Sequence, residues 1–210
     1  MPTSAFQVKI RHHGQPADAR VRFLVTGEES FLAQWERFLD ENETSLPNPT
    51  ASKDSVHLAS LAVDRWQQTK GLVKYAPDIE QINRWITDTS DEEICGIAGM
   101  EYPGFEGLIG VCHFHRTWTH NLFIDFLATH PALVASDTSP IKGIGLASTY
   151  FLATVANMLN CSYIWGETTP LSLPFYQKIF KLELAKTDMI RLEQDVYKQV
   201  LSSFNKLYSK

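Results

Sequence analysis

Hydrophobic and polar positions in the first 90 residues follow mainly helical spacing. From Glu29 to Asn42 the apolar residues fall on one stripe of a helix, at Phe31, Leu32, Trp35, Phe38 and Leu39, so this segment predicts an amphipathic helix. Ala19–Thr26 alternates as a strand does. Two prolines and many small polar residues predict a loop over Glu43–Ser55. We expect further helices over Leu61–Gln68 and Ile79–Thr87.

The second half of the chain changes to strand-like runs. Short turn-like segments separate three of them and predict an antiparallel meander: Glu93–Met100, Gly107–Arg116 and Leu122–Thr129. A helix that is apolar nearly all round, and therefore buried, is expected over Leu146–Leu159. The remaining elements expected are a strand over Ser162–Trp165, a helix over Pro174–Ile179 capped by Thr169 or Ser172, and a helix over Gln194–Tyr208. Since the buried helix connects two strands, those strands should be parallel neighbours in a mixed α/β sheet.

Composition excludes several classes of protein. The chain has 210 residues, 44% hydrophobic and 20% charged, which predicts one globular domain over 1–210. We expect a cytoplasmic protein, because no apolar run is long enough to cross a membrane and the N-terminus lacks a signal-peptide pattern. Its three cysteines have no close spacing, which fits a reducing compartment. The net charge of -5 argues against nucleic acid as a partner.

The segment Lys142-Gly143-Ile144-Gly145, just before the buried helix, predicts an anion site. The first amides of a helix lack partners, and glycines without side chains let a phosphate approach them. A tight turn without ligand is the alternative. A Walker A sequence is absent, and the dinucleotide fingerprint requires a strand that runs directly into the first glycine, whereas here a loop intervenes.

Three stretches together resemble the GNAT superfamily of acyl-CoA-dependent N-acetyltransferases: LFIDFLATHP, SPIKGIGLAST and SYIWGETTPLSLPFYQKIF. Thr129-His130-Pro131 stands at the family's V-x-P segment, Lys142–Gly145 at its pyrophosphate loop and Phe175–Lys178 at its FYxK segment. The resemblance implies a GNAT-type fold, with a central, mostly antiparallel sheet flanked by helices. A splayed pair of parallel strands would surround the glycine-loop helix. It also implies an acceptor side in 1–90, an acyl-CoA-binding core in 91–181 and a strand and helix in 182–210.

The same resemblance implies acetyl-CoA as the acyl donor and no metal. The backbone of Leu127 and Thr129 would bind the pantetheine arm. The remaining cofactor contacts would come from the glycine loop, the start of its helix and the turn after the next strand: Lys142, Gly143, Ile144, Gly145, Leu146, Ala147 and Thr169.

Catalysis by this family is direct attack of an amine on the thioester, and Tyr176 would protonate the departing sulfur. For the base, Glu167 at the end of a strand is the first choice. His113 or His115, Asp125 in mid-strand and a chain of waters stay open. His113, His115 and His120 could suggest a metal, but without another clear cluster of cysteine, histidine or carboxylate residues we expect ordinary histidines.

The function expected is therefore N-acetylation of a primary amine on a small molecule or peptide, in a ternary complex. The alternative is an inactive GNAT-like module that binds CoA or acyl-CoA, since Pro140 stands where the family has arginine or glutamine. Neither nucleic acid nor membrane is expected as a partner, and a homodimer is left open.

Overall fold

The computed structural model describes residues 5–88, 93–134, 138–180 and 189–207. In these ranges nine strands form one mixed sheet in the order β7-β1-β2-β4-β5-β6-β8-β9, with β3 paired to β4. The strands are β1 (Phe6–His12), β2 (Gln15–Phe23), β3 (Lys74–Tyr75), β4 (Ile94–Glu101), β5 (Leu108–Arg116), β6 (Leu122–Thr129), β7 (Ile141–Lys142), β8 (Tyr163–Glu167) and β9 (Met189–Glu193).

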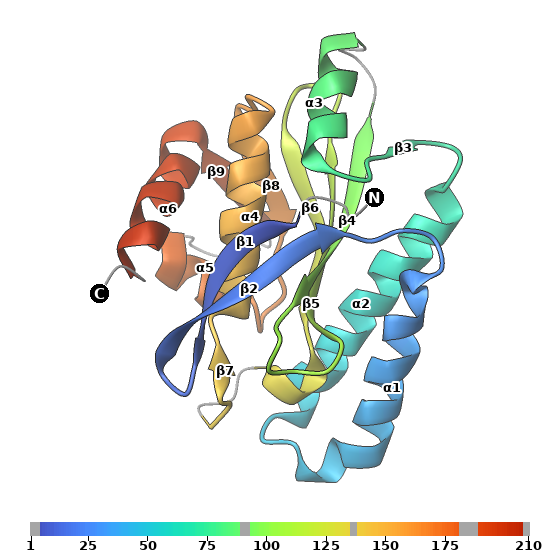
Figure 1. Ribbon diagram of the computed structural model, residues 1–210, viewed down its shortest axis with the longest axis vertical. Coiled ribbons are helices and arrows are strands. Elements are labelled where there is room, and N and C mark those ends of the chain that lie inside the picture. The colour runs from blue at the N-terminus through green and yellow to red at the C-terminus, as the bar shows by residue number, and fades with distance from the viewer. Residues whose placement is uncertain (1–4, 89–92, 135–137, 181–188, 208–210) are drawn as a thin grey trace.

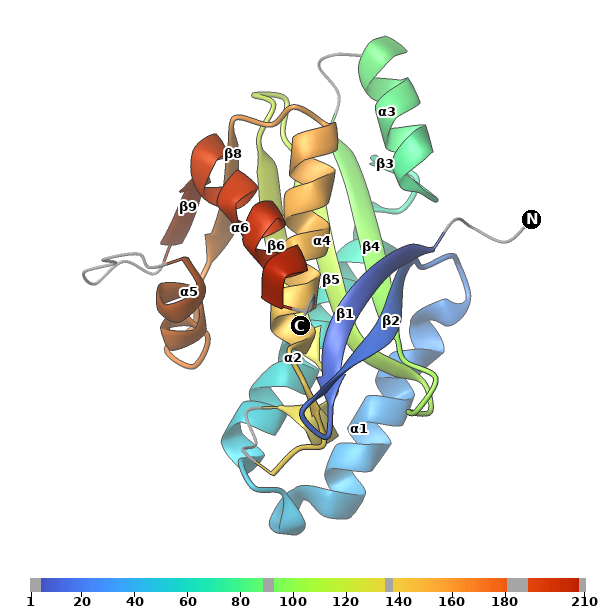
Figure 2. The ribbon, with the colours of Figure 1, turned by 60° about the vertical axis from the view of Figure 1, so that its left-hand side comes forward.

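Helices cover both faces of the sheet (Figure 1). α1 (Phe31–Asn42) and α2 (Pro49–Thr69) lie on one face, and α4 (Ile144–Met158) and α6 (Gln194–Leu207) on the other. Figure 2 shows α6 lying across α4, where Tyr150 and Phe204 stack with ring centroids 4.1 Å apart. The remaining helices are α3 (Ile79–Asp88) and α5 (Leu173–Phe180). Among the described helices, none is long and apolar enough to cross a membrane.

The predicted fold class is confirmed. β4, β5 and β6 form the expected antiparallel meander, and β6 and β8, on either side of α4, are parallel neighbours. Most other pairs are antiparallel. The helices expected near Glu29, Ile79, Leu146, Pro174 and Gln194 are all present within two residues of their expected starts.

Two local predictions near the N-terminus need correction, and one strand there was not predicted. The loop expected over Glu43–Ser55 ends early, because α2 begins at Pro49. Asn48 caps the helix by accepting a hydrogen bond from the amide of Ala51 at 3.1 Å, and proline is well suited to the first helical position. The strand expected over Ala19–Thr26 instead spans Gln15–Phe23, and its hairpin partner β1 was not expected.

The described end of the chain contains a strand followed by a helix. β9 pairs antiparallel with β8 along its whole length. The final helix is described as far as Leu207, and Lys181 and Tyr208 lie outside the described residues.

One irregularity of the sheet separates the two parallel strands beside α4. β6 and β8 pair over only three positions, and the last pair is Ile124 with Gly166. Beyond it β6 continues to Thr129, while the chain after Glu167 turns away into α5. The pairing of β6 with β5 shifts at the same place, so that Asp125 forms a bulge. Bulges bend a strand and re-aim its side chains. The parallel pair therefore opens at Asp125.

Candidate functional site

The glycine loop presents free amides at the start of α4. Gly143 is the N-cap residue, with a left-handed φ of 86°, a conformation that glycine adopts without strain. Its carbonyl accepts the first hydrogen bond of the helix, from Ala147, so the amides of the three residues between them have no acceptor within the helix. The helix dipole and the adjoining Lys142 add positive charge. The arrangement suits a phosphate group.

Gly145 has a different role from Gly143. A Cβ atom on Gly145 would lie 3.2 Å from Cζ of Phe175, a tight contact with an aromatic ring. The missing side chain therefore lets α5 pack closely against the first turn of α4. This packing brings the FYxK segment of α5 beside the glycine loop.

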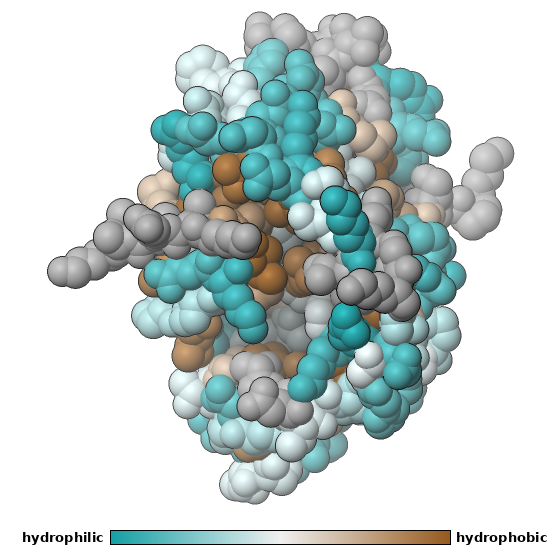
Figure 3. Space-filling view, turned by 90° about the vertical axis from the view of Figure 1, so that its left-hand side faces the viewer, coloured by the Kyte–Doolittle hydropathy of each residue, from teal (hydrophilic) through white to brown (hydrophobic). Residues whose placement is uncertain are grey.

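The open edge of β6 lies next to this loop. Because the amide of His130 donates to Ile109 of β5, the backbone groups of Leu127 and Thr129 point away from β5. Thr129 is already bonded: Oγ of Ser55, on α2, accepts from its amide at 3.0 Å and donates to its carbonyl. Leu127 lies beyond the last residue that β8 pairs. The surface seen from the side of α5 and α6 is hollowed, with hydrophobic residues around the hollow (Figure 3).

Tyr176, the expected acid, lies in the core beside this edge. Its side chain is buried and stacks on Phe180 with centroids 6.1 Å apart. Burial raises the pKa of Tyr176 to about 12, with a smaller contribution from the Cys112 thiol of β5. Cys112 pairs with Leu127, so Tyr176 approaches the open edge of β6 from the α4 side. A phenol with this pKa keeps its proton at neutral pH and can donate it.

Glu167 and Thr169 lie at the far side of the opening. Glu167 is exposed and follows the last residue of β8 that pairs with β6. Thr169 and Ser172 bond reciprocally, amide to hydroxyl, at 2.9 and 3.2 Å. Both residues therefore take part in the cap at the start of α5 that was expected from either one.

Asp125, His113 and His115 form one hydrogen-bonded group on the α2 side of the sheet. Oδ2 of Asp125 lies 2.9 Å from Nδ1 of His113 and 2.8 Å from Nδ1 of His115. Burial alone would raise the pKa of Asp125, but the hydrogen bonds from the two histidines outweigh it and lower the pKa to about 2. The carboxylate is therefore ionised at neutral pH.

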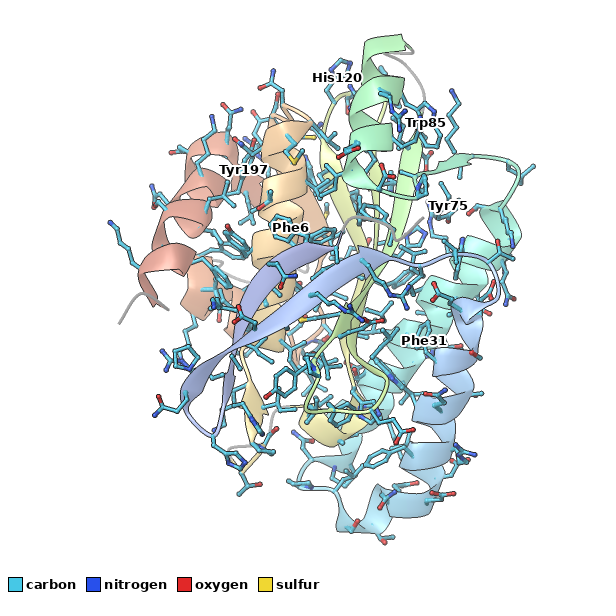
Figure 4. All side chains as sticks on the ribbon, viewed as in Figure 1. Phe6, Phe31, Tyr75, Trp85, His120 and Tyr197 are labelled. Atoms are coloured by element: carbon cyan, nitrogen blue, oxygen red, sulfur yellow. The ribbon has the colours of Figure 1, made fainter. Side chains whose placement is uncertain are left out.

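A metal role for the histidines gains no geometric support in the described residues. Both strand histidines direct Nδ1 at the same carboxylate oxygen, and His120 lies at the top end of the sheet, away from Tyr75 (Figure 4). No group of three or more metal-ligating side chains occurs within the described ranges.

Three residues of this region were missed from the sequence. Ser55 bonds to Thr129, Tyr75 bonds to His113, and Arg65 lies 3.5 Å from Asp125. Ser55 fell in the segment expected to be a loop. If α2 had been recognised, Ser52 and Ser55 would have marked a polar strip on an otherwise apolar face of that helix.

A separate pocket of about 690 Å³ lies between β2, α1 and the β4–β5 turn. Its charged groups bond to one another: Arg20 and Arg22 each donate to Glu101, at 2.6 and 2.7 Å. None of its lining residues belongs to the glycine loop, to β6 or to β8.

Comparison with known proteins gives structural matches only. No protein-family model and no curated protein matches the chain. Among solved structures it is similar to a putative acetyltransferase from T. thermophilus, with a TM-score of 0.49 and 10% identity, covering 99% of each chain. A second is the GNAT domain of S. lividans PAT, with a TM-score of 0.47 and 13% identity, covering 89% of this chain and 94% of that one.

A third similar structure is yncA of Salmonella typhimurium, a putative acetyltransferase with its cofactor acetyl-CoA, with a TM-score of 0.43 and 10% identity, covering 84% of this chain and 94% of that one. The chain spans less than half of two longer matches, 46% of a nourseothricin acetyltransferase and 38% of a tandem GNAT protein from the clavulanic acid pathway. Roles for individual residues rest on the chain's own geometry.

Proposed function

We propose that the chain is an N-acetyltransferase that moves an acetyl group from acetyl-CoA to a primary amine in a ternary complex. One observation carries this proposal. The pairing of β6 with β8 stops at Ile124, and the freed edge of β6 is followed in the chain by the glycine loop at the start of α4. A Cβ on Gly110 of β5 would lie 3.0 Å from Cγ2 of Ile144 and 3.4 Å from the carbonyl oxygen of Ala128, so the start of α4 lies beside this part of β6. A phosphate held there would be next to a slot for an extended arm.

The residues present fit acetyl-CoA, which carries a pyrophosphate at one end of an extended amide-containing arm. The amides at the start of α4 and the charge of Lys142 would hold the pyrophosphate. The unpaired backbone of Leu127 would bond to the arm as a neighbouring strand does. Ser55 already bonds to the backbone of Thr129. Among the described residues of this edge, the backbone of Leu127 is therefore a better partner for the arm than that of Thr129.

The reaction forms a C–N bond and breaks the C–S bond of the thioester. An acceptor that arrives as an ammonium ion loses two protons in total: one replaces the acyl group on sulfur, and the other is released. Tyr176 is the proposed donor of the proton to sulfur, because its buried phenol remains protonated at neutral pH. Glu167 is the base expected from the sequence, where it would accept the proton of the amine through water.

The acceptor would approach on the α2 side of the opening. Phe123 and Trp165 are cross-strand neighbours there and are both partly exposed. Glu167 follows Trp165 by two residues, and side chains alternate along a strand, so both lie on one face. Aromatic faces and carboxylates attract ammonium groups. The guanidinium of Arg191 already lies over the Trp165 ring, 5.7 Å from its centroid, so the Glu167 carboxylate is the main support for a cationic amine as the acceptor.

One observation favours the inactive binding module as a second candidate. Pro140 stands at the family's phosphate-donor position, and its carbonyl accepts a hydrogen bond from the amide of His13 at 2.7 Å. This position therefore connects β7 to the β1–β2 turn and supplies no side-chain donor.

Two measurements test the proposal. Release of the CoA thiol from acetyl-CoA, assayed with a panel of primary amines, should show turnover with at least one of them, whereas binding without release would favour the module. In calorimetry, Gly145→Glu should abolish CoA binding, because a carboxylate enters the anion site. Asn157→Glu adds the same charge at the exposed far end of α4 and serves as the control. Lys142→Gln should weaken binding without new bulk, and unchanged affinity in both site variants would refute the loop as the phosphate site.

A further inference from the structure

The polar group around Asp125 extends as a chain of hydrogen bonds through the α2 side of the sheet. It runs from Thr69 at the end of α2 through Tyr75 of β3 to His113, Asp125 and His115. Figure 4 shows Tyr75 on the side of the sheet that α2 covers. His113 is fully buried, Asp125 is nearly so, and 14% of the His115 side chain is exposed. The number of protons on the side chains of this hydrogen-bond chain determines its charge.

Counting protons from the α2 end gives a direction to the first two contacts. Oγ1 of Thr69 lies 2.7 Å from the carbonyl oxygen of Arg65, and a carbonyl can only accept. The hydroxyl proton of Thr69 is used there. The contact of 2.7 Å between Thr69 and the hydroxyl of Tyr75 must therefore use the proton of Tyr75.

The donor in the contact between Tyr75 and His113 follows in the same way. Nε2 of His113 lies 2.7 Å from Oη of Tyr75, and since the phenol proton already points to Thr69, His113 must donate. On the other side of the ring, Nδ1 lies 2.9 Å from the ionised carboxylate of Asp125, which can only accept. This count assigns a proton to each ring nitrogen of His113, which would make the ring an imidazolium.

His115 bonds to the same carboxylate oxygen as His113. Nδ1 of His115 also donates to Asp125, at 2.8 Å. The carboxylate already faces the positive charges of His113 and of Arg65, whose Nε lies 3.5 Å from Oδ1. A third positive charge at this carboxylate is disfavoured by repulsion. His115 thus keeps one proton, on Nδ1, and its Nε2 has no hydrogen-bond partner in the described parts of the chain.

We propose that Thr69, Tyr75 and His113 form a one-way hydrogen-bond chain that holds His113 as a buried imidazolium beside Asp125, and that Nε2 of His115 is the base that takes the proton of the acceptor amine. The second part rests on the proposed acetyltransferase function and replaces Glu167 as the base. Asp125 is the residue at which β6 leaves β8, and His115 pairs with Phe123 on the same face. The base therefore adjoins the surface proposed for the acceptor.

The first part is tested without substrate. Long-range ¹H–¹⁵N spectra near neutral pH report which ring nitrogens carry protons, and the variants His113→Asn and His115→Asn assign the signals. We expect two protonated nitrogens in His113, and in His115 a protonated Nδ1 with an unprotonated Nε2. Tyr75→Phe removes the acceptor for Nε2 of His113, so that ring should lose its second proton. An unprotonated nitrogen on His113 in the unmodified protein would overturn the chain.

The second part is tested by single-turnover kinetics. His115→Asn preserves a donor toward Asp125 but removes the base, so the rate should fall about 10²–10⁴-fold with acetyl-CoA affinity unchanged. His120→Asn, the same substitution at an exposed turn, is the matched control and should leave the rate unchanged. A wild-type rate in His115→Asn overturns the base. If the unmodified protein turns over no amine, both the proposed function and the base fail, whereas the ring-nitrogen signals still decide the charge of His113.

Discussion

Replacing His130 with asparagine tests how much a buried neutral histidine contributes to the pH dependence of stability. His130 follows β6, and its side chain is buried against Trp35, Phe38 and Phe105, with ring centroids 4.8 to 5.3 Å away. Its Nδ1 accepts a hydrogen bond from the amide of Ala132 at 3.1 Å. A proton on Nδ1 would remove this bond and place a charge among aromatic rings. Burial accordingly lowers the pKa of His130 from 6.5 to about 4.

The size and sign of the effect follow from this shift. Since the unfolded chain binds the proton more readily, the stabilisation is complete above a pH of about 6.5 and is lost as the pH falls toward about 4. A shift of this size corresponds to about 3 kcal/mol at ~1.4 kcal/mol per unit, of which about 2–3 kcal/mol should disappear between about pH 7 and about pH 4.5. Asparagine does not titrate, and its side-chain oxygen can accept from Ala132 as the imidazole does.

The assay is urea unfolding of both proteins at these two pH values, followed by tryptophan fluorescence. The variant loses ring packing at every pH and should be less stable at about pH 7. The stability difference between the two proteins should shrink by about 2–3 kcal/mol at about pH 4.5. All other titrating groups are common to both proteins and cancel in the comparison. If the two stability curves run parallel between these pH values, the reasoning about His130 is refuted.

Four further predictions concern the site and its support. Tyr176→Phe should lower the single-turnover rate about 10²–10⁴-fold with CoA affinity unchanged, whereas an equal rate would make the residue one of packing only. Replacing all three cysteines should preserve acetyl transfer, because burial raises the pKa of the thiols, to about 12 for two of them, and ping-pong kinetics would contradict this. Gly143→Ala should cost about 1–2 kcal/mol in urea unfolding, because alanine is strained at a φ of 86°, and a smaller loss would argue against strain at this cap. Ser55→Ala should lower the free energy of unfolding by about 1–3 kcal/mol, and by more than Ser52→Ala does. Ser55 bonds to both backbone groups of Thr129, whereas Ser52 bonds to one carbonyl. Equal losses of stability in the two variants would contradict this reasoning.

Local patterns were enough to predict the meander, the crossover helix and the glycine loop. Each depends on residues close together in the chain, such as the glycines beside Lys142, whose spacing alone indicates a helix start. The start of α2 was missed although its signal is local. Asn48 and Pro49 form a cap and first helical residue, but prolines among small polar residues are also typical of loops, so the local pattern favours a loop.

The arrangement around Asp125 could not be predicted, because it depends on register. Asp125 is a polar residue in a hydrophobic strand, and this local pattern marks it as a candidate. Its partners, however, are set by a bulge that shifts the pairing between His113 and Phe114. Tyr75 reaches His113 from a strand of only two residues, too short to leave a pattern in the sequence. Contacts of this kind follow from tertiary packing and not from propensity.

The short outer strands of the sheet have a consequence for how the protein behaves at high concentration. Along the described strand order, the sheet ends at β7, with two residues, and at β9, with five. β9 carries Arg191 and Glu193, joined by an ion pair at 2.8 Å. Short, charged edges are poor templates for strand addition by another molecule. The unpaired backbone of β6, by contrast, lies in the interior of the strand order, between β5 and β8. The protein can therefore keep an unpaired strand edge without exposing it to aggregation.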